Sequence, residues 1–350
     1  MATWDRLADL RVEVEGYALE RLELAVSPEF TRVTTVIRLR GGGEEGVGED
    51  VTYEPEDQVA QQDAGPYLRL AGRWTLGELC ERIGELDLFP QPPRREVSRR
   101  YRRWAFESAA LDLALRQAGT TLAAALGREP RPVTFVVSTR LAGPDMFAPI
   151  ARRLERYPRM RFKLDPTNEW DDALIDRLAA TGAVDTLDLK GQYKGTPVDV
   201  ETDPGLYRRV AEAFPHAWLE DPDLNDETER VLEPHRDRIT WDAPLHTVAD
   251  IEALPFKPRT INVKPSRFGG LEELFAVYDH CEANGIACYG GGQFELGPGR
   301  GQIEYLASLF HPDMPNDVAP VGYHAPEPAP GLPESPMPPR PAATGFRWDG

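Results

Sequence analysis

The sequence predicts an α/β protein: a modified (β/α)8 barrel preceded by a smaller α+β domain. Two observations predict this fold. From about residue 132 onward, short apolar segments alternate with helical segments, as the strands and helices of such a barrel do. The earlier part of the chain instead alternates single apolar and polar residues, which is typical of half-buried antiparallel strands. The length of 350 residues is sufficient for two such domains.

The first part of the chain combines strands with helices. Residues 11–16 and 31–40 show the period-two alternation of strands, and a glycine-rich turn follows before another strand. Helices are expected over residues 75–86 and 96–118, and the second carries many small apolar residues. We therefore predict an N-terminal α+β domain over residues 1–127.

The second part repeats a strand, a loop and a helix over residues 128–324. An open doubly wound sheet is the alternative to a barrel, but no GxGxxG motif or P-loop follows the first strand. The proline-rich residues 325–350 are expected to pack back on the N-terminal domain or to be disordered. Eight apolar segments are predicted to be strands: 133–138, 161–165, 184–190, 217–221, 239–242, 260–264, 286–290 and 317–323.

Charge and cysteine content limit the classes of function. The chain has 58 acidic and 40 basic residues and a formal net charge of −18, which argues against nucleic acid or an anionic membrane as a partner. Its three cysteines have no CxxC spacing, which argues against disulfides and structural zinc and fits a reducing compartment. The sequence contains no signal peptide and no apolar run of about 18 residues. We therefore expect a cytoplasmic protein.

Acidic side chains end three neighbouring strands of the predicted barrel: Asp188, Glu220 and Asp242. Active-site residues of such barrels lie at these carboxyl ends. Adjacent strands are about 4.8 Å apart, so three inward-pointing carboxylates can converge on one ion, and a divalent cation would remove their mutual repulsion. An all-oxygen donor set favours Mg²⁺ or Mn²⁺ over zinc. The alternative is that each acidic residue caps the helix after its strand.

Two lysines are expected on opposite sides of the barrel mouth. Lys163 lies on strand two and Lys264 ends strand six, and these strands are four apart in a ring of eight. This placement suits two proton-transfer groups on opposite faces of a metal-bound substrate, and burial beside a cation is expected to lower a lysine's pKa toward neutrality. The alternative is that each lysine is a structural partner of a carboxylate. Five further polar residues at strand ends or on mouth loops are candidate substrate contacts: Asp165, Lys190, Asn262, Gln293 and Glu295.

Several motifs, in their order and spacing, resemble those of the enolase superfamily, and within it the muconate-lactonizing branch. The match extends over nearly the whole chain. The motifs are Gly46-Val-Gly-Glu-Asp, the helical Ala109-Ala-Leu-Asp-Leu-Ala-Leu-Arg, Leu219-Glu-Asp-Pro, Asn262-Val-Lys with the later pair Gly269-Gly270, and Gly290-Gly-Gly-Gln-Phe-Glu.

The resemblance implies a (β/α)7β barrel with an N-terminal capping domain. It also implies a Mg²⁺-dependent enzyme that removes the proton α to a substrate carboxylate and forms an enolate. By position, the three strand-end carboxylates match the metal ligands, and Lys163 and Lys264 match the strand-two and strand-six bases. Strand seven carries no histidine, which argues against the mandelate-racemase branch.

Two motifs depart from the family pattern. The usual K-x-K of strand two reads Arg161-Phe-Lys163-Leu-Asp165, so Lys163 matches either the first or the second lysine. In the first case a carboxylate stands where the family has its base. The usual D-x-N of strand three reads Asp188-Leu-Lys190, and a cation so close is expected to weaken the metal site or to replace part of it. A weaker alternative assigns residues 165–170 to the strand-three motif, which leaves the barrel one strand short.

We therefore predict a metal-dependent isomerase (an epimerase, racemase or cycloisomerase) that uses Lys163 and Lys264 as its acid/base pair. A lyase that acts by β-elimination, like o-succinylbenzoate synthase, is the first alternative. A barrel that binds an acidic ligand without catalysis is the second. The expected substrate is a small carboxylate, and the expected assembly is a homo-oligomer.

Overall fold

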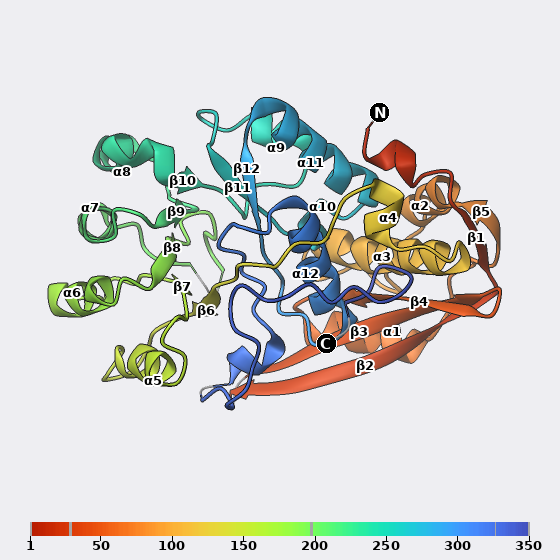
Figure 1. The fold of residues 1–350 in the computed structure, drawn as a ribbon, viewed down its shortest axis with the longest axis horizontal. Coiled ribbons are helices and arrows are strands. Elements are labelled where there is room, and N and C mark those ends of the chain that lie inside the picture. The colour runs from red at the N-terminus through yellow and green to blue at the C-terminus, as the bar shows by residue number, and fades with distance from the viewer. Residues whose placement is uncertain (1, 28–29, 197–198, 326, 349–350) are drawn as a thin grey trace.

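The computed structural model describes residues 2–27, 30–196, 199–325 and 327–348. Two parts lie side by side: antiparallel strands with helices α1 to α4 on one side of the view, and the barrel strands with helices α5 to α9 on the other (Figure 1). Within the described residues, no helix has both the length and the apolar character that a bilayer crossing needs.

Within the described residues, the N-terminal part contains two small antiparallel sheets, one 3-10 helix and four α-helices. Its strands are β1 (Arg11–Val14), which pairs with β5 (Gly72–Thr75), and the series β2 (Gly16–Ser27), β3 (Phe30–Gly41) and β4 (Glu44–Asp50), paired in that order. Its helices are η1 (Trp4–Arg6), a single 3-10 turn, and α1 (Pro55–Ala64), α2 (Leu76–Glu85), α3 (Ser98–Gln117) and α4 (Leu122–Leu126).

Strand β4 packs directly against helix α3, and two glycines make this possible. A Cβ atom added at Gly46 would lie 2.2 Å from the carbonyl oxygen of Ala109, and one at Gly48 would lie 2.1 Å from that of Ala105. No side chain fits at such distances, so the strand backbone rests on the helix. The small residues of α3 therefore serve this contact.

The second part is a barrel of parallel strands whose helices lie outside it, as predicted. The five-stranded sheet has the order β10-β9-β8-β7-β6, and β11 pairs with β12. The strands are β6 (Val137–Thr139), β7 (Phe162–Leu164), β8 (Val184–Asp188), β9 (Trp218–Glu220), β10 (Ile239–Thr240), β11 (Thr260–Val263) and β12 (Ala287–Gly290). The helices are α5 (Ala148–Arg156), α6 (Asp172–Ala180), α7 (Pro204–Ala213), α8 (Asp226–Leu232), η2 (Glu233–Arg238), α9 (Val248–Glu252), α10 (Pro265–Phe268), α11 (Leu271–Asn284) and α12 (Pro298–Phe310).

A few backbone contacts close the ring between the two groups of strands. The amide of Asn262 in β11 donates to the carbonyl of Trp241 after β10, at 2.9 Å. On the other side, Asp317 forms a parallel bridge with Gly291, next to β12, and its neighbour Asn316 bridges to Phe135, just before β6. Residues 316–317 thus stand where an eighth strand would be.

The eighth strand expected over residues 317–323 was wrong. Only its first residue makes a bridge, and residues 321–324 form a 3-10 helix, η3 (Val321–His324). Pro320 directly precedes this turn and has no amide hydrogen to donate to a neighbouring strand. The apolar pattern of this segment therefore reflects burial in a turn.

The C-terminal stretch returns to the N-terminal part. Phe346 is buried, with its ring 6.3 Å from that of Trp104 in α3 and 6.1 Å from that of Tyr305 in α12. The carboxylate of Asp112 accepts hydrogen bonds from the Phe346 amide at 2.8 Å and from Arg347 Nε at 2.7 Å. Residues 326, 349 and 350 of the expected tail lie outside the described residues.

Candidate active site

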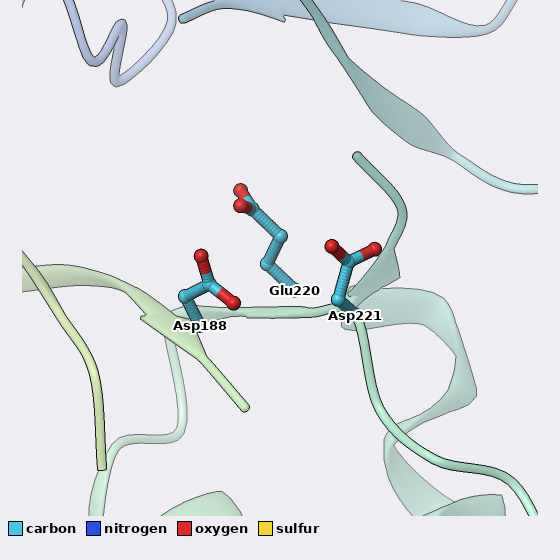
Figure 2. Close-up of side chains that lie close together, drawn as sticks. All are labelled: Asp188, Glu220 and Asp221. Carbon is cyan, nitrogen blue, oxygen red and sulfur yellow. The ribbon is translucent and has the colours of Figure 1, made fainter. Parts of the chain in front are cut away.

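The carboxyl ends of two neighbouring barrel strands, β8 and β9, place three acidic groups together. Asp188 is the last residue of β8, Glu220 is the last residue of β9 and Asp221 follows it. One carboxylate oxygen from each lies within 4.8 Å of the others, and all three residues are buried. Their carboxyl groups point to the same side of the strand ends (Figure 2).

Asp221 was not among the predicted ligands. Consecutive strand residues point to opposite faces, which would turn Asp221 away from Glu220. Its φ of 50° breaks that alternation. Its carboxylate also accepts hydrogen bonds from the amides of Asp242, at 2.8 Å, and Ala243, at 3.0 Å. The sequence signal for it was only its position beside Glu220.

These strand-end acids do not cap the helices that follow them. Side-chain oxygens of Asp203, Asn225 and Thr247 cap α7, α8 and α9 respectively. The capping alternative considered from the sequence is therefore wrong, because other residues satisfy the first amides of these helices.

The third predicted ligand, Asp242, lies in a separate cluster of hydrogen bonds beside the acidic group. Its Oδ2 accepts from Lys264 Nζ at 2.7 Å and from the Tyr193 hydroxyl at 3.0 Å. Its Oδ1 lies 3.1 Å from Arg267 Nε. These cations hold the pKa of Asp242 well below its usual range despite burial, with Arg267 the stronger influence. That Asp242 binds metal stays a prediction.

Lys163 lies among the carboxylates. Its Nζ donates to Glu220 Oε1 and lies 3.3 Å from Asp188 and 3.9 Å from Asp317. Burial disfavours the ammonium, but Glu220 and Asp188 outweigh burial and raise the pKa of Lys163 well above its usual value. The direction is opposite to the one expected from burial alone. The two predicted catalytic lysines therefore contact different carboxylates.

The second oxygen of Glu220 is also bound. It accepts a hydrogen bond from the Tyr289 hydroxyl and one from Asn262 Nδ2 at 3.2 Å. Asn262 was a predicted substrate contact, but here it orients a carboxylate. Tyr289, in β12, was missed; a tyrosine in a buried strand usually needs a hydrogen-bond partner, which is the signal that could have identified it. Burial raises the pKa of Glu220 to about 8 and that of Asp221 to about 7.

The two residues that depart from the family motifs lie together. Lys190 Nζ is 2.5 Å from Asp188 Oδ2 and 3.6 Å from Asp165 Oδ2. Lys190 has a φ of 55°, so its backbone turns at the end of β8. The ammonium therefore stands between two acids, one from β8 and one following β7.

The remaining predicted contacts belong to the loop after β12. The carboxylate of Glu295 accepts from the Gln293 amide at 2.7 Å and lies 3.3 Å from Arg300. Gln293 Nε2 lies 3.4 Å from the hydroxyl of Tyr101 in α3. Both side chains thus support the loop and its contact with the N-terminal part.

The donor set fits a hard divalent cation. Three buried carboxylates offer closely spaced oxygens, the ligand type that Mg²⁺ prefers. Together with Asp165 and Asp242, these carboxylates make five acids that face four cationic side chains, so within the described residues the cations do not fully balance the acids. The acids are Asp165, Asp188, Glu220, Asp221 and Asp242, and the cations are Lys163, Lys190, Lys264 and Arg267.

The curated relatives that match this chain are enzymes, and solved structures of enzymes share its fold. The chain is 28% identical over 236 residues to o-succinylbenzoate synthase of Bacillus subtilis, a match that covers 66% of this chain and 62% of that enzyme. It is 27% identical over 323 residues to the N-succinylamino acid racemase of Thermus thermophilus, covering 85% of this chain and 81% of that enzyme. These relatives are enzymes.

The solved structures show the same fold at lower identity. Muconate cycloisomerase from Pseudomonas fluorescens matches with a TM-score of 0.63 and 17% identity, over 96% of this chain and 94% of that one. A dipeptide epimerase from Methylococcus capsulatus, complexed with Mg ion, matches with a TM-score of 0.59 and 21% identity, over 79% and 82%.

Family models cover both parts of the chain. Residues 5–125 match the N-terminal domain, and residues 129–325 the C-terminal domain, of a family described as a domain of unknown function, DUF8230. Together with the neighbours above, these matches confirm the resemblance predicted from the motifs. The chain belongs to the DUF8230 family, and its fold is similar to that of solved members of the enolase superfamily.

Proposed function

We propose that this protein is a Mg²⁺-dependent isomerase that removes and returns the proton on the carbon next to a substrate carboxylate. The observation that carries the proposal is the buried group of strand-end carboxylates with a lysine on either side: Lys163 at Glu220 and Lys264 at Asp242. Asp188 and Glu220 would hold the metal, with Asp242 or Asp221 as the third ligand. Mn²⁺ is the alternative metal.

The two lysines would divide the proton transfers. Lys163 comes from β7 and Lys264 follows β11, on well-separated parts of the ring. One neutral amine takes the α-proton, and the ammonium of the other delivers a proton to the opposite face, so the carbon is inverted and no atom is lost. When bound, Mg²⁺ would stabilise the negative charge that develops on the substrate carboxylate.

The surrounding residues would prepare the carboxylates for this role. Tyr289 and Asn262 hold one oxygen of Glu220 in place, whereas Tyr193 and Arg267 each contact a different oxygen of Asp242. Ligands held in fixed positions favour Mg²⁺, because this ion requires a near-ideal octahedral arrangement of ligands. Substrates would enter beside the loop after β12, and we propose that residues 1–127 form a capping domain over it.

Isotope exchange tests the reaction. The protein with Mg²⁺ is incubated in heavy water with a panel of N-acylated amino acids, including N-succinylamino acids, and the α-proton signal is followed by NMR. We expect that signal to disappear and optical rotation to fall. Lys264→Met should abolish the fall in optical rotation, because inversion needs both lysines, whereas Lys257→Met, an exposed change at the opposite end of the barrel, should not. Loss of optical rotation at the wild-type rate in Lys264→Met would refute the proposal.

A lyase is the second candidate, because the o-succinylbenzoate synthases are among the relatives. Elimination would release water or another leaving group and create a double bond, which mass spectrometry and ultraviolet absorbance detect. If Mg²⁺ binds but neither proton exchange nor elimination is detected, the result would favour a barrel that binds an acidic ligand without catalysis. We also propose that the protein is a cytoplasmic homo-oligomer. Sedimentation of the purified protein tests the oligomeric state.

A further inference from the structure

Lys190 satisfies both oxygens of one proposed metal ligand. Its ammonium lies 2.5 Å from Asp188 Oδ2, and its backbone amide donates to Asp188 Oδ1 at 3.2 Å. The side chain is 13% exposed, so water does little to replace this partner. The charge of Asp188 is therefore already neutralised by a neighbour two residues away, and an incoming cation would meet an ammonium at that carboxylate.

A second carboxylate is positioned to accept the same ammonium. Asp165 Oδ2 is 3.6 Å from Lys190 Nζ, too long for a hydrogen bond but close enough for an ion pair. The other oxygen of Asp165 is buried, and no hydrogen-bond partner for it is found within the described residues. An acceptor left without a donor in the interior is unfavourable unless some state of the protein supplies one.

Lys163, the other lysine at Asp188, is bound differently. It makes its shortest contact with Glu220 rather than with Asp188, and its side chain is only 2% exposed. It also lies within β7 itself, paired with Thr186, two residues before Asp188. Moving Lys163 would leave Glu220 without its cation, whereas moving Lys190 toward Asp165 keeps every acid near a positive charge.

We propose that Lys190 is a resident counter-ion that moves from Asp188 to Asp165 when a divalent cation binds. The inference rests on the proposed function insofar as that function places the cation at Asp188. It assigns one purpose to two unusual positions: Lys190 neutralises the site before the cation arrives, and Asp165 receives the ammonium afterward. Asp165 and Lys190 are then positioning residues that set the affinity for the cation.

A double-mutant cycle on Mg²⁺ affinity tests this exchange. Isothermal calorimetry measures Mg²⁺ binding to the wild type, Lys190→Met, Asp165→Asn and the double variant. Lys190→Met removes the competing ammonium, so binding should tighten by about tenfold or more. Asp165→Asn leaves the displaced ammonium without a carboxylate, so binding should weaken by about tenfold.

The double variant separates exchange from simple charge. If Asp165 acted only as one more negative charge, Asn at this position would weaken binding equally with or without Lys190. If it receives Lys190, most of its effect disappears in the Lys190→Met background, because no ammonium remains to be moved. Equal effects in both backgrounds, or unchanged affinity in Lys190→Met, would overturn the exchange.

Controls keep this test interpretable. Lys257→Met makes the same change in net charge at an exposed position and should leave Mg²⁺ affinity unchanged. Circular dichroism checks that each variant folds, and Lys190→Gln replaces Lys190→Met if the latter does not. If the wild type binds Mg²⁺ and exchanges the α-proton, but Lys190→Met has the same Mg²⁺ affinity, only the proposed movement of Lys190 would be defeated. Mg²⁺ binding that follows the cycle, without turnover of any substrate, would defeat only the proposed reaction. No binding to any variant at millimolar Mg²⁺ would defeat both.

Discussion

The carboxylate of Glu49 accepts a hydrogen bond from the backbone amide of Gly299, at 3.0 Å, and so joins the last strand of the N-terminal sheet to the first turn of α12. The same carboxylate accepts from the amides of Leu296, at 2.6 Å, and Gly297, at 2.9 Å. Amides at the start of a helix have no partner within the helix. Glu49 supplies that partner from another part of the fold and fixes the loop after β12.

Replacing Glu49 by alanine should therefore destabilise the protein by about 2 kcal/mol or more, because buried amides lose their acceptor. Urea unfolding followed by circular dichroism measures the change. The matched control is Glu45→Ala on the same strand, where only partly exposed ion pairs with Arg38 and Arg40 are lost. That change should cost less than about 1 kcal/mol. Equal losses in the two variants would contradict the role of Glu49.

Arg32 ties the same loop to the N-terminal part through four backbone carbonyls. Its guanidinium donates to Val51, Thr52, Gln293 and Phe294 at 2.7 to 3.1 Å. Lysine has one nitrogen and cannot reach four separate acceptors.

Arg32→Lys should accordingly speed hydrogen exchange of the amides in residues 291–297 by about tenfold or more, measured by mass spectrometry. Arg38→Lys, in which the altered side chain pairs with partly exposed glutamates, is the control and should leave that loop protected. Unchanged protection in Arg32→Lys would show that other contacts hold the loop.

Glu304, buried in α12, should make stability depend on pH. Burial raises the pKa of Glu304 to about 7, although Arg300 opposes the rise. A carboxyl whose pKa is higher in the folded state contributes its full stabilisation below the pKa of the unfolded chain, 4.5. That stabilisation is lost as the pH rises through 7. Glu304→Gln should abolish that loss, worth roughly 3 kcal/mol between pH 4 and pH 8. Urea unfolding at both values checks this, and exposed Glu252→Gln should behave as the wild type does.

Glu220→Gln should weaken Mg²⁺ binding by about tenfold or more, because a neutral amide is a poorer ligand than a carboxylate. The hydrogen bonds from Lys163 and Tyr289 would also have to rearrange around the amide. Calorimetry measures the affinity. Glu227→Gln, an exposed change at the start of α8, is the control. Wild-type affinity in Glu220→Gln would remove Glu220 from the set of ligands.

Phe346→Ala should destabilise the protein by about 3–5 kcal/mol, because it empties the space between α3 and α12 that the ring fills. Thermal unfolding measures the loss. Phe346→Leu keeps most of the volume and should cost about 1.5 kcal/mol or less. A mild effect of the alanine variant would indicate that the tail contributes little to the core.

The sequence predicted the barrel because its information is local. Period-two and helical patterns can be recognised over a few residues, and strand ends then place Asp188 and Glu220 without further knowledge. Asp221 was not predicted as a ligand because a single φ of 50° reverses the side on which its side chain points. The strand expected at residues 317–323 failed because an apolar pattern does not distinguish a buried turn from a buried strand.

The sequence also could not predict which side chains contact each other. The sequence placed Lys163 and Lys264 on opposite sides, but it could not show that the first contacts Glu220 and the second contacts Asp242. Such contacts depend on side-chain reach across the ring and on tyrosines from other strands. Asn262, which was expected to touch the substrate, donates a hydrogen bond to Glu220, and its contact with a substrate stays a prediction.

The position of Phe346 between α3 and α12 has a consequence during synthesis on the ribosome. Helix α3 is made long before the aromatic ring that covers Trp104. The amino-terminal portion therefore exposes an apolar surface until residue 346 has emerged. Nascent chains truncated before residue 346 should bind chaperones that recognise such surfaces, and full-length chains should be released from them.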